Sequence, residues 1–185
     1  MIKKHFFIAA VLMSALCGQA EASTLSADGV WNAFDVDNSI SNSGNLEWID
    51  LGANTLSFDF TLTGWAYLKV VDGGFAGDRF NVYDNGNLLG ATSVAVNTYP
   101  NSVNDDFVAA SADSNFSYGM FLLGVGSHSI TGLLSQSALD NSGAAINATI
   151  GAVSLTAVPL PAAAWLYLTG TALLGFISRR RKATI

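Results

Sequence analysis

The segment from residue 56 to residue 63, Leu-Ser-Phe-Asp-Phe-Thr-Leu-Thr, alternates apolar and polar side chains without an exception. Successive side chains of a β-strand point to opposite faces, so this pattern predicts a strand with one buried face and one solvated face. No amphipathic helical stripe of ten or more residues competes with it between residues 23 and 157. The folded part of the chain is therefore expected to consist of β-strands.

Further segments have the composition of strands and are separated by turns rich in glycine and asparagine. Strands are expected at residues 65–71, within 77–90, and at 91–96, 118–124, 128–134 and 144–157. Asn85 and Gly86 tolerate positive φ, as a tight hairpin turn requires. The longest loop is expected at 97–115. About eight short strands predict an all-β domain, an antiparallel β-sandwich of the jelly-roll kind.

The first 22 residues have the three-part layout of a secretory signal peptide with a helical centre. Two lysines at positions 3 and 4 precede the apolar segment 6–16. Signal peptidase accepts small residues at the first and third positions before its cut, and Ala22 and Ala20 occupy those positions. Cleavage after Ala22 would make Ser23 the mature N-terminus.

The C-terminal region contains a 19-residue run without charge, Leu160 to Ser178. Roughly 20 apolar residues in a helix span the hydrocarbon core of a bilayer, so a transmembrane helix is expected at 160–178. A basic tail follows at once and consists of Arg179, Arg180, Arg181 and Lys182. The positive-inside rule keeps such a tail in the cytoplasm and the domain outside. A buried C-terminal strand or helix is the alternative, which four consecutive cations argue against.

The four residues around the start of this run are Val158, Pro159, Leu160 and Pro161. Together with the apolar run and the basic tail, they resemble the PEP-CTERM sorting signal of Gram-negative bacteria in a variant that begins Val-Pro-Leu-Pro-Ala-Ala. Leu160 stands where the commoner Pro-Glu-Pro form has glutamate. The resemblance implies that exosortase, a membrane-embedded enzyme with a cysteine nucleophile, removes the tail during export. Molecules that keep their helix would stay bound to the membrane.

The resemblance divides the chain into a signal peptide at 1–22, an exported β-sandwich domain at 23–157 and a sorting signal at 158–182. Within the domain, residues 77–90 and 124–130 resemble segments of other β-rich exported proteins that end in this signal. That looser resemblance implies a fold and a destination, and no activity.

The expected domain is strongly acidic. Residues 23–158 contain two cations, Lys69 and Arg79, and thirteen acids, so their formal charge is −11, against −6 for the whole chain. Nucleic acid would be repelled, which excludes it as a partner. The only cysteine, Cys17, lies in the expected signal peptide, and Leu16 before it argues against lipidation there. The domain therefore has no disulfide and no thiolate ligand.

Few residues of the domain could support catalysis. His128 is its only histidine and Glu47 its only glutamate. Ser127 and Ser129 flank His128 on an expected strand and should point to the opposite face, and no Gly-x-Ser-x-Gly elbow occurs. No catalytic residue is therefore assigned. A hydrolase would need a pocket that gathers His128 or Glu47 with two or more aspartates.

Aspartates close to glycine and asparagine raise the question of calcium. Residues 35–39 begin like an EF-hand loop, but Ile40 and Leu46 occupy the positions that need glycine and glutamate, which excludes that motif. A calcium site of another kind could draw on four loop aspartates, Asp72, Asp78, Asp105 and Asp106. The alternative is that these carboxylates cap turns.

Four aromatic residues, Trp31, Trp48, Trp65 and Tyr67, could stack on sugar rings or could pack in the core. Three functions thus stand as hypotheses. The leading one is a non-catalytic protein of the cell surface or extracellular matrix, exported and processed with signal peptidase, exosortase and the membrane as partners. The second is a calcium-dependent module that binds carbohydrate such as exopolysaccharide in a biofilm. The third is a secreted hydrolase.

Overall fold

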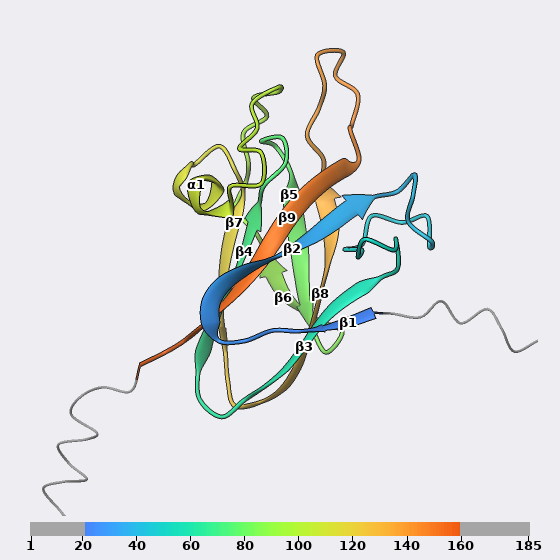
Figure 1. Ribbon diagram of the computed structural model, residues 1–185. Helices are drawn as coiled ribbons and strands as arrows, with labels where there is room; N and C mark the ends of the chain where they lie inside the picture. The colour runs from blue at the N-terminus through green and yellow to red at the C-terminus, as the bar shows by residue number, and fades with distance from the viewer. Residues whose placement is uncertain (1–20, 160–185) are drawn as a thin grey trace, which may run out of the picture.

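The computed structural model describes residues 21–159, which form two β-sheets packed as a sandwich (Figure 1). Sheet A has five strands in the order β1 (Glu21–Thr24), β3 (Leu56–Leu62), β8 (Gly126–Gln136), β5 (Arg79–Asp84) and β6 (Asn87–Ala91). Sheet B has four in the order β2 (Asp28–Asp37), β9 (Ala148–Ala157), β4 (Ala66–Asp72) and β7 (Tyr118–Leu123). The described part of the chain also contains one short helix, α1 (Phe107–Ala112). The prediction of an all-β sandwich is confirmed.

Apolar side chains from both sheets fill the space between them, as a sandwich requires. Phe34 on β2, Phe80 on β5 and Trp48 from the connection between β2 and β3 are fully buried. The rings of Trp48 and Phe34 stack with their centroids 4.0 Å apart. A Cβ at Gly132 on β8 would collide with the Trp48 ring, so glycine is required beneath it. These rings make the centre of the core.

Two local patterns in the sequence correspond directly to structure. The alternating segment forms β3, in which Leu56, Phe58 and Leu62 are buried. Between β5 and β6 the chain turns at Asn85, with φ of 50°, and Gly86, with φ of 78°. The predicted strand and the predicted hairpin turn are therefore both confirmed.

The sandwich departs from the predicted one in its N-terminal strands. β1 runs parallel to β3, with Ser23 opposite Phe58, whereas the other strand pairs described in the two sheets are antiparallel. The sequence patterns predict neither β1 nor β2. In β2 the outward positions carry Asp35 and Asp37 beside the buried Phe34 and Val36. Aspartate is depleted in strands, so these two residues make the strand hard to predict from the sequence.

The strand predicted at 91–96 is wrong, because this segment crosses from one sheet to the other. The Thr92 amide donates to the Phe80 carbonyl on β5, 2.9 Å away, whereas the next amide, that of Ser93, donates to the Tyr118 carbonyl on β7 at 2.9 Å. The Thr92 hydroxyl is buried and accepts the Phe80 amide at 3.0 Å. A segment that bonds to both sheets in turn cannot continue as a strand of either.

Three connections meet at one end of the sandwich, uppermost in Figure 1: residues 73–78, 97–117 and 137–147. The Ala76 amide donates to the Asn101 carbonyl at 3.1 Å, and the Leu139 amide donates to Asn97 Oδ1 at 2.7 Å. The helix α1 lies in the second connection, within the predicted loop 97–115, and is too short to show helical periodicity. Its Ala110 packs with Val71 and other buried residues on the outer face of sheet B.

Most of the predicted targeting signals lie outside the described residues. This applies to residues 1–20, the run 160–178 and the basic tail 179–182. The expected cleavage site between Ala22 and Ser23 falls inside β1. Val158 is the first residue after β9, and its amide donates to the Trp65 carbonyl at 2.8 Å. Within residues 21–159, no helix is long and apolar enough to cross a bilayer.

Candidate functional site

Two of the four candidate metal ligands are brought together at the crowded end of the sandwich. Asp72 is the last residue of β4 and Asp78 directly precedes β5, and residues 73–77, Gly-Gly-Phe-Ala-Gly, join them. The connection therefore passes from sheet B to sheet A. Asp72 is 0% exposed and Asp78 is 1% exposed. Aspartate is almost never buried to this degree without a partner.

Each carboxylate of this aspartate pair has one satisfied oxygen and one orphaned oxygen. Asp72 Oδ1 accepts the Gly74 amide at 3.2 Å and the Thr149 hydroxyl at 3.5 Å. Asp78 Oδ1 accepts the Ala138 amide at 2.7 Å. Oδ2 of Asp72 and Oδ2 of Asp78 are buried without a hydrogen-bond partner among the described residues. Both side chains are thus held in place on one side only.

The electrostatics of the pair are unfavourable for two free carboxylates. Burial, reinforced by the charge of Asp78, raises the pKa of Asp72 to about 8. Burial likewise raises the pKa of Asp78 to about 6. Hydrogen bonds from the Thr149 hydroxyl and from backbone amides act in the opposite direction and do not compensate. The close contact between an acidic and a basic side chain found within residues 21–159 lies elsewhere, between His128 Nδ1 and Asp84 Oδ2, and no Lys or Arg of these residues forms a salt bridge with the pair.

Glycines beside the pair let neighbouring polar side chains pack closely against the backbone. A Cβ at Gly74 would collide with Thr149 Oγ1. Gly77 has φ of 136°, and a Cβ there would lie 2.8 Å from Asn97 Oδ1. Side chains at these two positions would thus crowd the oxygen atoms around the aspartates.

The other two candidate ligands lie apart from the pair and are exposed. Asp105 lies near β2. Burial raises the pKa of Asp35 on that strand, and the negative charge of Asp105 raises it further. Asp106 is the N-cap of α1, and its Oδ1 accepts the Ala109 amide at 2.9 Å. Among residues 21–159, no three histidine, cysteine or acidic side chains gather as a metal group. The four aspartates therefore do not form one site.

His128 is a structural residue of β8. Its Nδ1 lies 2.8 Å from Asp84 Oδ2 and its Nε2 lies 3.0 Å from the Gly124 carbonyl oxygen. The ring stacks on Phe60, with the centroids 5.4 Å apart. Both ring nitrogens are thus engaged with acceptors.

The serines beside His128 lie on the other face of sheet A. Asp59 pairs with Ser129 across the two strands, and Ser129 Oγ donates to Asp59 Oδ1 at 2.6 Å. A shallow hollow of about 430 Å³ passes over Asp59, Ser127 and the edge of His128. Neither Ser127 nor Ser129 hydrogen-bonds to the imidazole, so this arrangement does not form a catalytic triad.

Glu47 is buried in a nest of hydroxyl groups. Its Oε1 accepts hydrogen bonds from Ser41 at 2.8 Å, from Ser43, and from Thr55 at 3.5 Å. Burial alone would raise the pKa of Glu47, but these hydroxyls lower it below its ordinary value. The adjacent pocket, of about 720 Å³, is lined by no aspartate and no histidine. Neither Glu47 nor His128 thus anchors the acidic pocket that a hydrolase would need.

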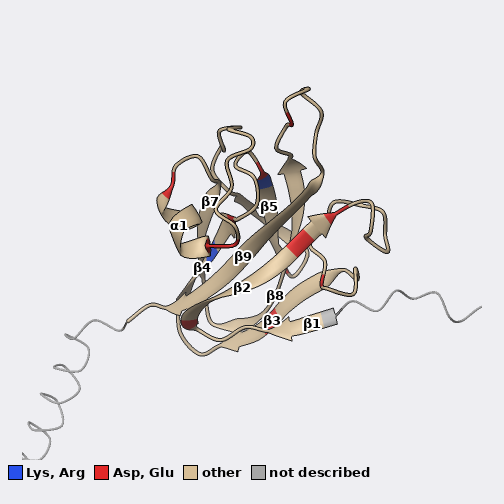
Figure 2. Ribbon diagram, turned by 45° about the horizontal axis from the view of Figure 1, so that its top comes forward, with Lys and Arg blue, Asp and Glu red and all other residues tan. Residues whose placement is uncertain are grey.

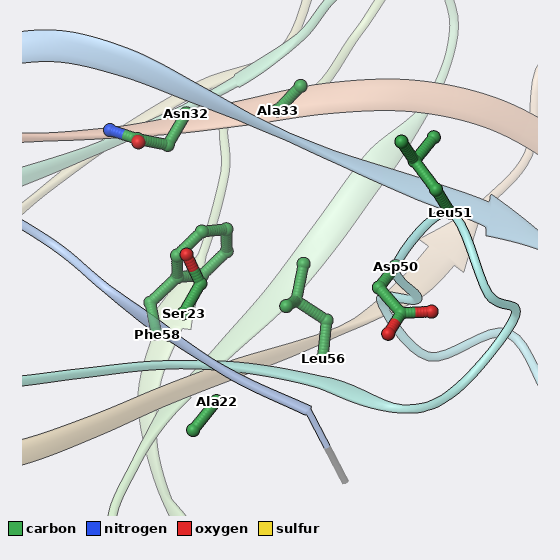
Figure 3. A pocket seen from close by; sticks show the side chains of 8 residues that line it. All are labelled: Ala22, Ser23, Asn32, Ala33, Asp50, Leu51, Leu56 and Phe58. Atoms are coloured by element: carbon green, nitrogen blue, oxygen red, sulfur yellow. The ribbon is translucent and has the colours of Figure 1, made fainter.

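A further pocket, of about 360 Å³, opens where β1 and β3 of sheet A approach β2 of sheet B. Figure 3 shows Leu56 and Phe58 pointing from β3 toward β2. Its one acidic residue, Asp50, is occupied by its own turn, since its Oδ1 accepts the Gly52 and Asn54 amides at 2.7 and 2.9 Å. The pocket offers no reactive group.

The four candidate sugar-stacking residues lie in three different environments. Trp48 is 0% exposed and belongs to the core, so its inclusion in a stacking surface is wrong. Trp31 packs against Phe107 of α1, with ring centroids 6.5 Å apart. Trp65 is 58% exposed and Tyr67 is 36% exposed, both at the start of β4. Of the four rings, only those of Trp65 and Tyr67 are exposed large rings at the sheet surface.

Acidic residues dominate the loops and β2, while the basic residues of the described part lie on β4 and β5 (Figure 2). No family model matches the sequence, and no curated protein matches it. Among solved structures, the chain is similar to the pre-peptidase C-terminal domain of a collagenase from Bacillus anthracis. The TM-score is 0.40 with 9% identity, over 75% of this chain and 97% of that one. A similarity of this extent carries no inference about function.

Proposed function

We propose that the protein is an exported, non-catalytic β-sandwich protein of the cell surface or extracellular matrix, sorted by its C-terminal signal. The observation that carries this proposal is where the sandwich ends. β9 ends at Ala157, and the Val158 amide makes the next bond of the chain to the domain, to Trp65. The motif that resembles a sorting signal therefore begins where the described fold has completed its sheets.

The motif has the physical properties of a processing site. Proline lacks an amide donor and holds the residue before it extended, which is the shape a protease cleft accepts. Pro159 and Pro161 flank Leu160 in this way, directly after the last strand. A cut near Pro161 would leave every strand of the sandwich intact and separate it from the apolar run at 160–178.

Contacts among the described residues support a non-catalytic role for the domain. The two groups that could act as acid or base in a hydrolase, His128 and Glu47, are both occupied by structural contacts. Neither side chain lies in a pocket with two or more aspartates, as a hydrolase would need. The proposal therefore assigns the domain a role in binding or assembly.

Mass spectrometry of the protein from the outer surface and the medium of exosortase-containing cells tests the proposal. We expect an N-terminus at Ser23 and a C-terminus near Pro161. Changing Pro159 and Pro161 together to alanine should leave the tail attached, while the control Val125→Ala, an exposed turn residue, should not. An intact C-terminus at Ile185 in the unaltered protein would show a stably anchored protein and contradict processing.

A second candidate function is binding of polysaccharide, and the exposure of Trp65 and Tyr67 favours it. A Cβ at Gly124 would lie 3.8 Å from the tip of the Trp65 ring, so the glycine leaves that ring accessible. Stacking on a sugar ring uses such a flat aromatic face. Calorimetry with the exopolysaccharide of the host should give binding that Trp65→Ala abolishes and Val125→Ala preserves. Equal binding by both variants would exclude this surface.

A further inference from the structure

The described residues do not neutralise the negative charge of the aspartate pair. Two carboxylates lie together in the interior, and the basic residue next to them is turned away: Arg79 donates its Nε to the Thr92 carbonyl at 2.9 Å. An unpaired buried charge costs several kcal/mol, and a second like charge beside it adds repulsion. Either a proton or a bound cation must offset the negative charge.

The hydrogen bonds around the pair favour a cation over a proton. Oδ1 of each carboxylate accepts a backbone amide, from Gly74 in one case and Ala138 in the other. Amide donors stabilise the charged form of a carboxyl group. Oδ2 of Asp72 and Oδ2 of Asp78 are buried and receive no hydrogen bond from a described residue, which leaves both oxygens free to coordinate a cation.

A third orphaned oxygen belongs to the same region. Thr98 Oγ1 is buried without a partner, and the Thr98 amide donates to the Ala76 carbonyl at 3.4 Å, in the middle of the glycine-rich connection. Thr98 belongs to a different connection from the aspartates, so a further oxygen in a segment that bonds to residues 73–78 lacks a partner among the described residues. Gly74 and Gly77 let Thr149 Oγ1 and Asn97 Oδ1 approach the connection closely, since a Cβ at either glycine would collide with these atoms.

We propose that Asp72 and Asp78 bind a calcium ion at the junction of β4 and β5. The side chains at the pair offer oxygen atoms, from two carboxylates and the Thr149 hydroxyl, and calcium prefers oxygen ligands. Softer metals are disfavoured, because residues 23–158 contain no cysteine and because His128 is already engaged by Asp84 and Gly124. The ion ties sheet A to sheet B and to the connections 97–117 and 137–147.

The ion is structural and does not contact a sugar on Trp65. Asp72 ends β4 and Trp65 precedes its start, so seven residue steps, roughly 23 Å at the rise of a strand, separate them. Loss of the ion would therefore weaken the fold before it affected any ligand at the aromatic surface. This separation lets the calcium site be tested without knowing what the protein binds.

The full-length protein in mild detergent, stripped with chelator, tests the proposal with calcium chloride as the probe. Native mass spectrometry should show one calcium ion per chain. The thermal midpoint at pH 7.5 should rise by about 5–10 °C at a calcium concentration a hundred times the dissociation constant. Magnesium at the same concentration should raise it less, because magnesium demands a rigid octahedral shell.

Variants locate the site. Asp72→Asn and Asp78→Asn should each abolish the calcium-dependent rise, and the control Asp105→Asn, which changes an exposed aspartate of a neighbouring connection, should keep it. Loss of the rise in all three variants would place the ion elsewhere and overturn the proposal. If the substitutions prevent folding, the unaltered protein still decides: no bound calcium and a midpoint equal in calcium and in chelator would show that the pair shares a proton instead.

Discussion

This small sandwich contains two buried carboxylate sites, Glu47 and the aspartate pair, and their pKa values are shifted in opposite directions. Glu47 is surrounded by three hydroxyl donors, and its pKa is lowered. Asp72 and Asp78 receive fewer donors and repel each other, and their pKa values are raised to about 8 and about 6. Glu47 is 8% exposed and the aspartates are 0% and 1% exposed, so the depth of burial and the number of donors together set the pKa of each carboxyl group.

The comparison also separates what the two sites do for the fold. Glu47 belongs to the segment that carries Trp48 into the core, and its hydroxyl partners close the connection between β2 and β3. The aspartate pair lies where the chain crosses from sheet B to sheet A. Both sites keep a buried oxygen without a partner, Oε2 of Glu47 and Oδ2 of each aspartate, but three hydroxyl groups donate to Glu47, whereas the aspartates repel each other. The following predictions test this contrast.

The largest effect is expected from Trp48→Ala, which removes the ring that holds the Glu47 segment in place. Loss of a fully buried tryptophan should cost about 3–5 kcal/mol of unfolding free energy, from lost burial and a residual cavity. Urea unfolding followed by circular dichroism measures it. Trp65→Ala, at an exposed ring, should cost less than about 1 kcal/mol. Equal losses would mean that the segment is not held by its tryptophan.

The second prediction removes two of the three hydroxyl partners of Glu47. The double variant Ser41→Ala and Ser43→Ala should lose about 2–3 kcal/mol at pH 7, because hydrogen bonds to a charged group are lost. The folded-state pKa of Glu47 is lowered, so this stabilisation is fully present above 4.5, the ordinary pKa of a glutamate, and disappears as the pH falls through the folded-state pKa.

The pH series supplies the control for that variant. The difference between the unaltered and double-variant proteins should therefore shrink steadily between pH 5 and pH 3 (about the range of a carboxyl titration). Ser142→Ala removes a serine that donates to the exposed Asp140 at 2.7 Å and should change the unfolding midpoint little at any pH. A pH-independent loss in the double variant would assign the effect to the turn alone.

The third prediction applies one chemical change to both sites. At pH 7.5 in chelator, Glu47→Gln should lower the unfolding free energy by about 1–2 kcal/mol, since the hydroxyl donors lose a charged acceptor. Asp72→Asn should instead leave stability nearly unchanged under the same conditions, because a carboxyl group whose pKa is raised to about 8 is largely protonated at pH 7.5 without a bound ion, and the amide replaces a neutral group. Thermal unfolding in chelator measures both. A loss in both variants would contradict the distinction between the two sites.

The smallest effect is expected at the two aspartates that the structure separates from the pair. Asp106→Ala should cost about 1 kcal/mol, the usual value of an N-cap. Asp105→Asn should stay within about 0.5 kcal/mol, as expected for an exposed position. Neither change should depend on calcium. A calcium-dependent effect of Asp106→Ala would bring this residue back into a cation site.

Local patterns predicted those parts of the fold that depend on neighbouring residues alone. β3 follows from strict alternation, and the β5–β6 turn follows from Asn85-Gly86, whose positive φ values are confirmed. The strand expected at 91–96 failed because Thr92 and Ser93 bond to different sheets, which no local pattern reports. β2 was missed for a related reason. Its aspartates face outward, and whether a strand tolerates aspartate at such positions depends on the element beside it.

The site shows the same limit. Asp72 and Asp78 could be selected from the sequence as acids beside glycines, but so could Asp105 and Asp106. Their separation into a buried pair, a carboxylate facing β2 and a helix cap depends on how three connections converge. Glu47 could be noticed as the only glutamate of residues 23–158, whereas its three hydroxyl partners could not be.

The sequence by itself determined the β-rich character of the domain, its hairpin turn and its acidic charge, because each of these is a property of composition or of residues close in the chain. The tertiary structure alone decided which carboxylates are buried, which of them meet and which oxygens lack partners. Those properties depend on contacts between segments far apart in the sequence, and the burial that such contacts create sets the local dielectric and the supply of donors.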